Sequence, residues 1–110
     1  MARVGYYRFD VWLANLEPVK GSEIKKTRPC VIISPKEIND NMQTVLIAPL
    51  TSTLTRFPFR LSCTFEHHQG QIALDHIRSV DKTRLIRKLG NIEEKTAIEI
   101  CELLNVLFEY

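Results

Sequence analysis

The sequence has no long hydrophobic run and little excess charge of either sign. None of its apolar stretches approaches the roughly 18 consecutive residues that a membrane-spanning helix needs. Its 15 basic and 13 acidic residues leave a formal net charge of only +2, so no polybasic tail would coat nucleic acid indiscriminately. We therefore expect a soluble protein that binds any charged partner through a local patch.

Cysteine is scarce, and its pattern excludes two kinds of small-domain scaffold. The three cysteines, Cys30, Cys63 and Cys101, are odd in number, widely spaced and set among apolar neighbours, so neither a disulfide framework nor a zinc knuckle is supported. The pair His67 and His68 has no third ligand at a zinc-like spacing. The sequence therefore predicts buried thiols, no metal and no other cofactor.

The N-terminal segment lacks the features of a secretion signal. Residues 1–10 contain no continuous apolar core and no cleavage pattern of small residues. We therefore expect the protein to be cytoplasmic.

Short apolar runs at regular spacing predict a mainly β domain. The length of 110 residues fits one domain over residues 1–110. A polar turn is expected at Asn39-Asp40-Asn41. The expected strands cover residues 11–16, 30–34, 44–48, 59–63, 71–74 and 76–80, a spacing typical of small barrels.

The hydrophobic period changes near the C-terminus. From Glu93 onward, apolar residues recur three and four positions apart, which indicates an amphipathic helix. We expect this helix to pack on the barrel through Ala97, Ile100, Cys101, Leu104, Leu107 and Phe108. The predicted fold is a small β-barrel with one C-terminal helix.

Two short polar segments have the chemistry of a phosphate-binding site. Residues 21–29 supply one carboxylate, two lysines and Arg28, whose backbone is restrained by the following Pro29. Residues 48–53 supply three consecutive hydroxyls, beginning at Thr51, after a strand-like run. Taken alone, the hydroxyls fit an ordinary strand-end turn and the cations fit a solvated loop, so a phosphate site requires the fold to bring the two segments together.

Five motifs in one order resemble a known family. They are Asp10-Val11-Trp12, Pro18-x-x-Gly21-Ser22-Glu23, residues 27–34 (TRPCVIIS), Pro49-Leu50-Thr51-Ser52 and residues 75–81 (DHIRSVD). In these motifs the chain resembles the MazF/PemK/Kid toxin endoribonucleases of type II toxin–antitoxin systems, over essentially its whole length.

The resemblance implies a fold and an activity. The implied fold is an SH3-like barrel of the CcdB/PemK type, assembled as a homodimer. The implied activity is sequence-specific, metal-independent cleavage of single-stranded RNA to 2′,3′-cyclic phosphate and 5′-hydroxyl ends, neutralised by a cognate antitoxin protein.

The resemblance also implies which residues are catalytic. Arg28 and Thr51 match the family's catalytic arginine and hydroxyl, and a guanidinium with a hydroxyl can stabilise a pentacoordinate phosphate without a metal. A guanidinium is a poor proton acceptor, so Glu23 is a candidate to orient Arg28 or to accept the 2′-hydroxyl proton. Asp75 and His76 are rival candidates, but the arginine that some members carry two residues before this aspartate is replaced here by Ala73.

Several further residues are predicted to bind the substrate. His76 stands where members commonly have glutamine, and its imidazole would make a contact with a base pH-sensitive. Phe9 stands where the family usually has glycine, which predicts a different local turn. The expected substrate-binding residues are Lys20, Ser22, Ser52, Asp75, His76 and Arg78.

Two other functions remain as alternatives. One is a catalytically silent module of the same fold that binds only RNA or an antitoxin, which the intact Glu23, Arg28 and Thr51 disfavour. The other is a gyrase poison of the CcdB type, a group that ends in Trp-Gly-Ile. This chain ends in Leu107-Phe108-Glu109-Tyr110 instead.

Overall fold

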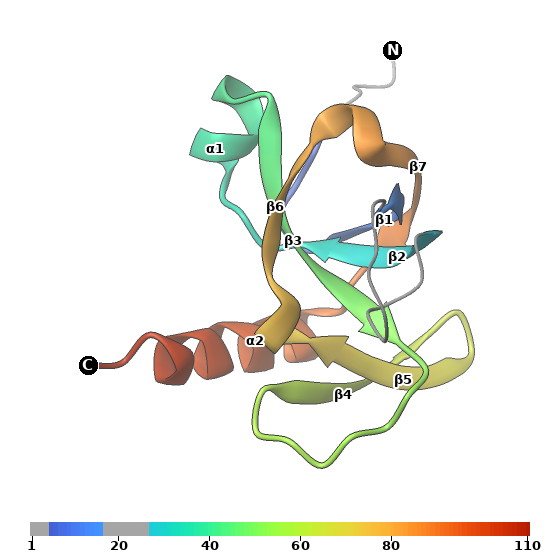
Figure 1. Cartoon of the computed structure of the whole chain (residues 1–110), viewed down its shortest axis with the longest axis vertical. Coiled ribbons are helices and arrows are strands. Elements are labelled where there is room, and N and C mark those ends of the chain that lie inside the picture. The colour runs from blue at the N-terminus through green and yellow to red at the C-terminus, as the bar shows by residue number, and fades with distance from the viewer. Residues whose placement is uncertain (1–4, 17–26) are drawn as a thin grey trace.

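The fold is known from a computed structural model that describes residues 5–16 and 27–110. Within these ranges the chain forms an antiparallel β-structure with two α-helices and two short 3₁₀ helices (Figure 1). The elements are β1 (Asp10–Asn15), β2 (Thr27–Ile32), α1 (Lys36–Asn41), β3 (Thr44–Thr51), β4 (Arg60–Phe65), β5 (His68–Ala73), η1 (Leu74–His76), β6 (Arg78–Asp81), η2 (Lys82–Arg84), β7 (Leu85–Asn91) and α2 (Glu94–Leu107).

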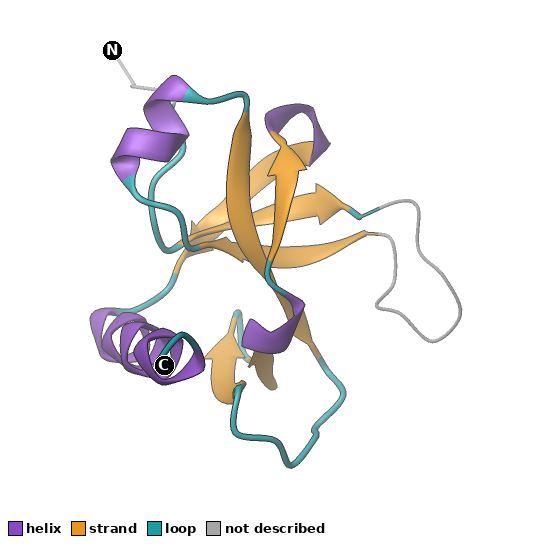
Figure 2. Cartoon of the chain, turned by 60° about the vertical axis from the view of Figure 1, so that its left-hand side comes forward, coloured by secondary structure: helices purple, strands orange, loops and turns teal. Residues whose placement is uncertain are grey.

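The strand β3 connects the parts of the sheet. The strand order is β4-β5-β3-β2-β1-β7, and β6 also pairs with β3. The first half of β3 pairs with β6, its middle pairs with β2, and its last two residues, Leu50 and Thr51, pair with β5. Figures 1 and 2 show the β4–β5 hairpin joined to the rest of the sheet at the far end of β3.

Side chains on the two faces of the central strands enter two different hydrophobic cores. Alternation along a strand sends successive side chains to opposite faces, and here both faces are buried. The inner core consists of Trp12, Ala14, Leu16, Cys30, Ile32, Val45, Ile47, Val80 and Leu85. The helix-side core consists of Val11, Val31, Ala48, Ile72, Leu74, Ile92, Ala97 and Ile100. This double burial explains why the sequence shows continuous apolar runs in these strands.

The predicted C-terminal helix is confirmed as α2, which packs on the helix-side core (Figure 1). Ala97 and Ile100 are buried, and Leu104 packs against them. The prediction was wrong for Phe108, whose residue surface is 75% exposed. Because α2 ends at Leu107, Phe108 lies beyond the last helical turn as its C-cap and does not continue the apolar face.

The polar turn predicted at residues 39–41 is wrong, since these residues end helix α1. Asn39 is buried and its amide donates to the Ser34 carbonyl oxygen at 2.9 Å. The Ser34 hydroxyl donates to the Asn39 side-chain oxygen at 2.5 Å and accepts the Leu46 amide at 3.0 Å. Asn39 is therefore a satisfied polar group inside the fold, which explains an asparagine where the sequence suggested exposure.

The six predicted strands exist, but two continue through prolines. β2 begins at Thr27 and includes Pro29, and β3 continues through Pro49 to Thr51. Proline lacks an N–H and usually marks a strand end. The strand boundaries predicted next to Pro29 and Pro49 therefore fall inside the observed strands. Strand β7 was not predicted, because it is an edge strand with largely exposed side chains after Leu85.

The prediction of buried thiols is confirmed for one cysteine only. Cys30 is fully buried in the same inner core as Trp12, whereas the free thiols Cys63 and Cys101 are half-buried. Among the helices that the structure describes, none is both long and apolar enough to cross a membrane.

Phe9 adopts a left-handed backbone conformation with φ of 73°. Its amide donates to the Ile32 carbonyl at 2.7 Å and its carbonyl accepts from the Ile92 amide at 2.8 Å, so the turn is fixed between two segments. Its side chain is half-buried against the helix-side core. The strain of a left-handed L-residue is offset by this packing and these hydrogen bonds.

We expect Phe9→Gly to be less destabilising than Phe9→Ala by about 1 kcal/mol, because both remove the ring but only glycine adopts this conformation without strain. Chemical denaturation of the two variants measures the difference. The control is the pair Ile98→Ala and Ile98→Gly at an exposed position within α2. There the alanine variant should be more stable than the glycine variant. An alanine variant at position 9 that equals the glycine variant would contradict the role of the backbone.

Candidate active site

Arg28 and Thr51 lie on neighbouring strands. Antiparallel pairing joins Cys30 to Pro49, and Arg28 and Thr51 each lie two residues beyond this pair on their own strands. The Arg28 Nη1 donates to the carbonyl oxygen of Leu50 at 2.5 Å. The described part of the first segment, residues 27–29, thus lies beside the end of β3, whereas residues 21–26 lie outside the described residues.

The Arg28 guanidinium is half-buried and only partly used by the protein. Its Nε is buried and has no hydrogen-bond partner among the described residues. Burial lowers the pKa of Arg28, and the nearby Cys30 opposes that shift. Since guanidinium remains protonated in proteins, Arg28 supplies a fixed cation with donors to spare.

The Thr51 side chain is oriented by its own strand end. Thr51 is only 7% exposed, and its Oγ1 accepts a hydrogen bond from the backbone N–H of Thr53 at 3.1 Å. Because a hydroxyl has one donor and two acceptor positions, this contact leaves its proton available for an anionic ligand.

Arg28 and Thr51 line one pocket of about 260 Å³. Exposed Glu66, His68 and Gln69 belong to its lining from the β4–β5 hairpin. The remaining lining residues are Pro29, Leu50, Ser52, Cys63, Phe65 and Gly70. The pocket thus combines a cation, hydroxyls and apolar side chains, a composition suited to a phosphate with an attached nucleobase.

The β4–β5 turn contributes to this pocket in a way the sequence did not indicate. Glu66 and His67 form the turn with φ of 50° and 65°, the pattern of a two-residue hairpin. His67 lies at the tip of this turn, but His68 begins β5 and lines the pocket. Two adjacent histidines therefore have different positions relative to the site.

Gly70 is required by a close approach between β5 and the end of β3. A Cβ atom built on Gly70 would lie 2.5 Å from the carbonyl oxygen of Thr51, a contact too short to tolerate without movement of the backbone. Gly70 is not among the site residues predicted from the sequence, although a glycine inside a strand pattern signals such an approach.

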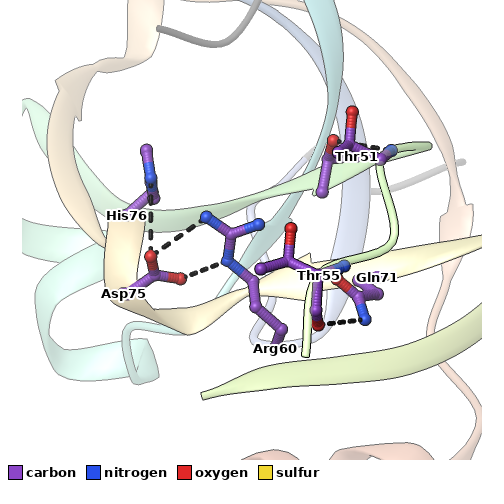
Figure 3. Close-up of polar contacts among 7 residues, drawn as sticks. Thr51, Thr55, Arg60, Gln71, Asp75 and His76 are labelled. Atoms are coloured by element: carbon purple, nitrogen blue, oxygen red, sulfur yellow. Dashed lines mark hydrogen bonds and ion pairs between the residues drawn. The ribbon is translucent and has the colours of Figure 1, made fainter. Parts of the chain in front are cut away.

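Asp75, in η1, is held by Arg60 from β4 (Figure 3). The Arg60 Nε and Nη2 donate to the two carboxylate oxygens of Asp75 at 2.6 and 3.1 Å. Arg60 lies directly opposite Ala73 in the β4–β5 pairing. The arginine that the sequence lacks two residues before Asp75 is therefore replaced by one from the facing strand.

This pairing makes Asp75 a weak proton acceptor. The hydrogen bonds from Arg60 lower the pKa of Asp75, and burial opposes the shift. The His76 Nε2 lies 3.5 Å from the same carboxylate. Neither Asp75 nor His76 lines the pocket of Arg28 and Thr51, so the structure does not bring these rival candidates into that pocket.

The other predicted binding residues have different positions. Arg78 on β6 donates from Nη1 to the Leu16 carbonyl oxygen at 3.4 Å, at the end of the described β1 segment. Ser52 lines the pocket. Lys20, Ser22 and Glu23 lie outside the described residues.

Cys30 is buried beneath Arg28 and does not act as a nucleophile in the resting site. Its thiol lies 3.6 Å from the Arg28 carbonyl oxygen. Burial raises its pKa to about 12, although Arg28 and Arg78 oppose the shift. The thiol is therefore protonated near neutral pH.

Comparisons with known proteins agree with this fold. A family model described as PemK-like, MazF-like toxin of type II toxin–antitoxin system matches residues 7–108. A protein from Staphylococcus epidermidis named Endoribonuclease MazF is 34% identical over 105 residues, which cover 90% of this chain and 88% of that protein.

Solved structures show the same fold. The crystal structure of MazF from Deinococcus radiodurans has a TM-score of 0.79 and 26% identity, and the match covers 99% of this chain and 100% of that one. An endoribonuclease from a mycobacterial species, solved with its cognate antitoxin, has a TM-score of 0.77 and 22% identity over 91% of each chain.

The architecture thus defines a small toxin-type β fold with one packing helix. The chain belongs to the PemK-like, MazF-like toxin family of type II toxin–antitoxin systems. The predicted family, fold class and enzyme class, an endoribonuclease, are confirmed.

We expect Gly70→Ala to destabilise the protein by about 1–3 kcal/mol, the usual cost of forcing extra atoms into a packed site. The Thr51 carbonyl and β5 must separate, so RNA cleavage should fall as well. Denaturant unfolding and a cleavage assay test both effects. Gly5→Ala is the control, because its added Cβ would meet only the flexible Tyr7 ring; equal stability of the two variants would refute the close-approach argument.

The Arg60–Asp75 pair predicts an acid-dependent stability difference. Because the folded state lowers the pKa of Asp75, the pair stabilises the protein above the unfolded carboxyl pKa of about 3.9, and this stabilisation is lost as pH falls through the lower folded value.

Wild type should therefore exceed Arg60→Gln in unfolding free energy by up to about 1 kcal/mol at pH 7, with the gap closing below about pH 4. Urea unfolding at pH 7, 5 and 3 measures it. Exposed Arg87 on β7 gives the matched control Arg87→Gln, and a gap that stays constant with pH would exclude Asp75 as its origin.

Proposed function

We propose that the protein is a sequence-specific, metal-independent endoribonuclease that cleaves single-stranded RNA and acts as the toxin of a toxin–antitoxin pair. The proposed products carry a 2′,3′-cyclic phosphate and a free 5′-hydroxyl. Arg28, Thr51 and Glu23 are the proposed catalytic residues.

One observation carries this proposal: the cation and the hydroxyl lie side by side in one pocket. Arg28 reaches the carbonyl of Leu50, the residue before Thr51, and both line the same cavity. The buried Nε of Arg28 has no partner within the described chain, and the Thr51 hydroxyl proton is not used by the Thr53 contact. An anionic phosphate group would accept from the Thr51 hydroxyl and from the guanidinium N–H groups of Arg28 that Leu50 leaves unused.

The proposed reaction uses the RNA as its own nucleophile. The 2′-oxygen attacks the adjacent phosphorus, the phosphorus–O5′ bond breaks, the 2′-hydroxyl proton passes to a base, and the 5′-oxygen leaves with a proton. Arg28 and Thr51 stabilise the negative charge that develops on the non-bridging oxygens. No nucleophile from the protein is required.

Glu23 is the proposed group that orients Arg28 or accepts the 2′-hydroxyl proton. Arg28 is a poor base because its guanidinium stays protonated, and Asp75 is a weak one because Arg60 lowers its pKa. In a plot of the RNA cleavage rate against pH, the fall at acidic pH should therefore disappear in Glu23→Gln. The same fall should remain in Asp75→Asn.

Substrate and partner contacts complete the proposal. Ser52 extends the hydroxyl row beside Thr51, and Lys20, Ser22, Asp75, His76 and Arg78 are proposed to bind the RNA strand. We further propose a cytoplasmic homodimer that a cognate antitoxin neutralises, as the mycobacterial relative was solved with its own antitoxin.

The direct test is cleavage of a long single-stranded RNA in EDTA by wild type, Arg28→Ala and Thr51→Val. Wild type should give discrete fragments with cyclic phosphate ends, and each variant should lose about 100- to 1000-fold in rate. Circular dichroism checks that the variants fold. No cleavage by wild type, or equal cleavage by all three, would favour a binding module without catalytic activity.

Arg28→Lys should lose most of the activity even though it keeps the positive charge. Lysine lacks the planar fork that can hold the Leu50 carbonyl and a phosphate at once. Single-turnover rates compare it with wild type and with Arg87→Lys on the exposed face of β7. Wild-type rates for Arg28→Lys would show that charge alone is sufficient.

A further inference from the structure

The connection between β3 and β4 presents apolar side chains next to the candidate active site. It covers residues 52–59, directly after Thr51. Leu54 and Phe57 on it are 62% and 47% exposed. Exposed apolar side chains beside a phosphate site are suited to contact unstacked nucleobases.

Gln71 holds the middle of this connection (Figure 3). Its Oε1 accepts from the Thr55 backbone N–H and its Nε2 donates to the Thr55 carbonyl oxygen, each at 3.0 Å. The side-chain amide thus satisfies both backbone groups of one residue, as a neighbouring strand would.

The position of Gln71 makes this contact rigid. Gln71 is 7% exposed and lies directly opposite Thr51 in the β3–β5 pairing. It follows Gly70, which leaves no room for a Cβ atom beside the Thr51 carbonyl. A buried amide with two backbone partners on a central strand has little freedom to move. Gln71 therefore fixes the position of the loop relative to the end of β3, which carries the Thr51 hydroxyl.

Among the described residues, the other hydrogen bonds of the connection lie near its two ends. The Thr53 amide binds Thr51 Oγ1 at its start, and the Arg60 amide donates to the Phe57 carbonyl at 3.1 Å near its end. Phe57 also packs edge-on against Phe59 with ring centroids 5.9 Å apart. Between these ends, Gln71 supplies the hydrogen bonds recorded for Thr55 in the described chain.

We propose that Gln71 is a positioning residue for RNA sequence selection. By fixing Thr55, it sets where Leu54 and Phe57 meet a base near the scissile phosphate. It acts through the loop and does not touch the reacting atoms. The inference rests on the proposed ribonuclease function, since selection can be measured only if RNA is cut.

The test compares wild type with Gln71→Met, which keeps the side-chain length and removes both hydrogen bonds. Sequencing of fragment ends from a randomised single-stranded RNA gives the preference for each cleavage sequence. We expect the ratio of rates for the preferred and next-best sequences to fall by about 10-fold, as misplacement of a contacting group can cost up to about 100-fold. Cleavage itself should persist.

Two further variants make the result specific. Gln43→Met is the matched control, because Gln43 is exposed and immediately precedes β3, at the opposite end of that strand from Thr51; its cleavage pattern should equal that of wild type. Gln71→Glu keeps the acceptor for the Thr55 N–H but loses the donor, so its preference should lie between wild type and Gln71→Met.

Hydrogen exchange of the Thr55 amide gives a readout that is independent of RNA. Exchange should accelerate in Gln71→Met and stay slow in Gln43→Met. An unchanged cleavage preference in a folded Gln71→Met would overturn the inference and leave the ribonuclease function intact. Complete loss of cleavage in that variant would also overturn it, since Gln71 would then serve catalysis itself. A wild-type protein that cuts no RNA would refute the proposed function and this role together.

Discussion

The antiparallel pairing of β3 is the constraint on which the rest of the structure depends. This strand shares its hydrogen bonds with β2, β5 and β6. A slip of one residue would turn Ile47 out of the inner core and Ala48 out of the helix-side core at once. The two cores therefore fix the register, and the register fixes which residues meet Thr51 at the strand end.

Two kinds of contact then converge on that strand end. Arg28 arrives from β2 and supplies charge, while Gly70 and Gln71 arrive from β5 and supply close approach and loop support. The proposed catalytic pair and the loop that we expect to select the RNA sequence therefore both contact the backbone around Thr51. Sequence selection and catalysis can therefore respond together to any change at Thr51.

The central strands and the C-terminal helix were predictable because their signals are local. Apolar runs and the change of period at Glu93 indicate them directly. The predicted strand boundaries were wrong at Pro29 and Pro49, because strand pairing in the fold tolerates a residue without an N–H at these positions. Strand β7 escaped prediction because it has too few buried side chains to give a pattern.

The residues of the candidate site likewise divide into those that the sequence could predict and those that it could not. Arg28 and Thr51 could be found because each belongs to a short motif in the sequence. Arg60 and Gln71 could not, since their importance comes from partners 15 and 16 residues away on a neighbouring strand or loop. Asp75 looked incomplete beside Ala73 for the same reason: the missing cation comes across the sheet and not along it.

The buried thiol of Cys30 allows β2 to be followed by chemical modification. Alkylating reagents react with the thiolate, and a thiol with a pKa of about 12 and no exposed surface offers almost none at neutral pH. Half-buried Cys101 has surface for the reagent to reach, so it can serve as an internal reference. Modification of Cys30 followed by mass spectrometry would thus time the opening of the strand that carries Arg28, without a mutation or an attached probe.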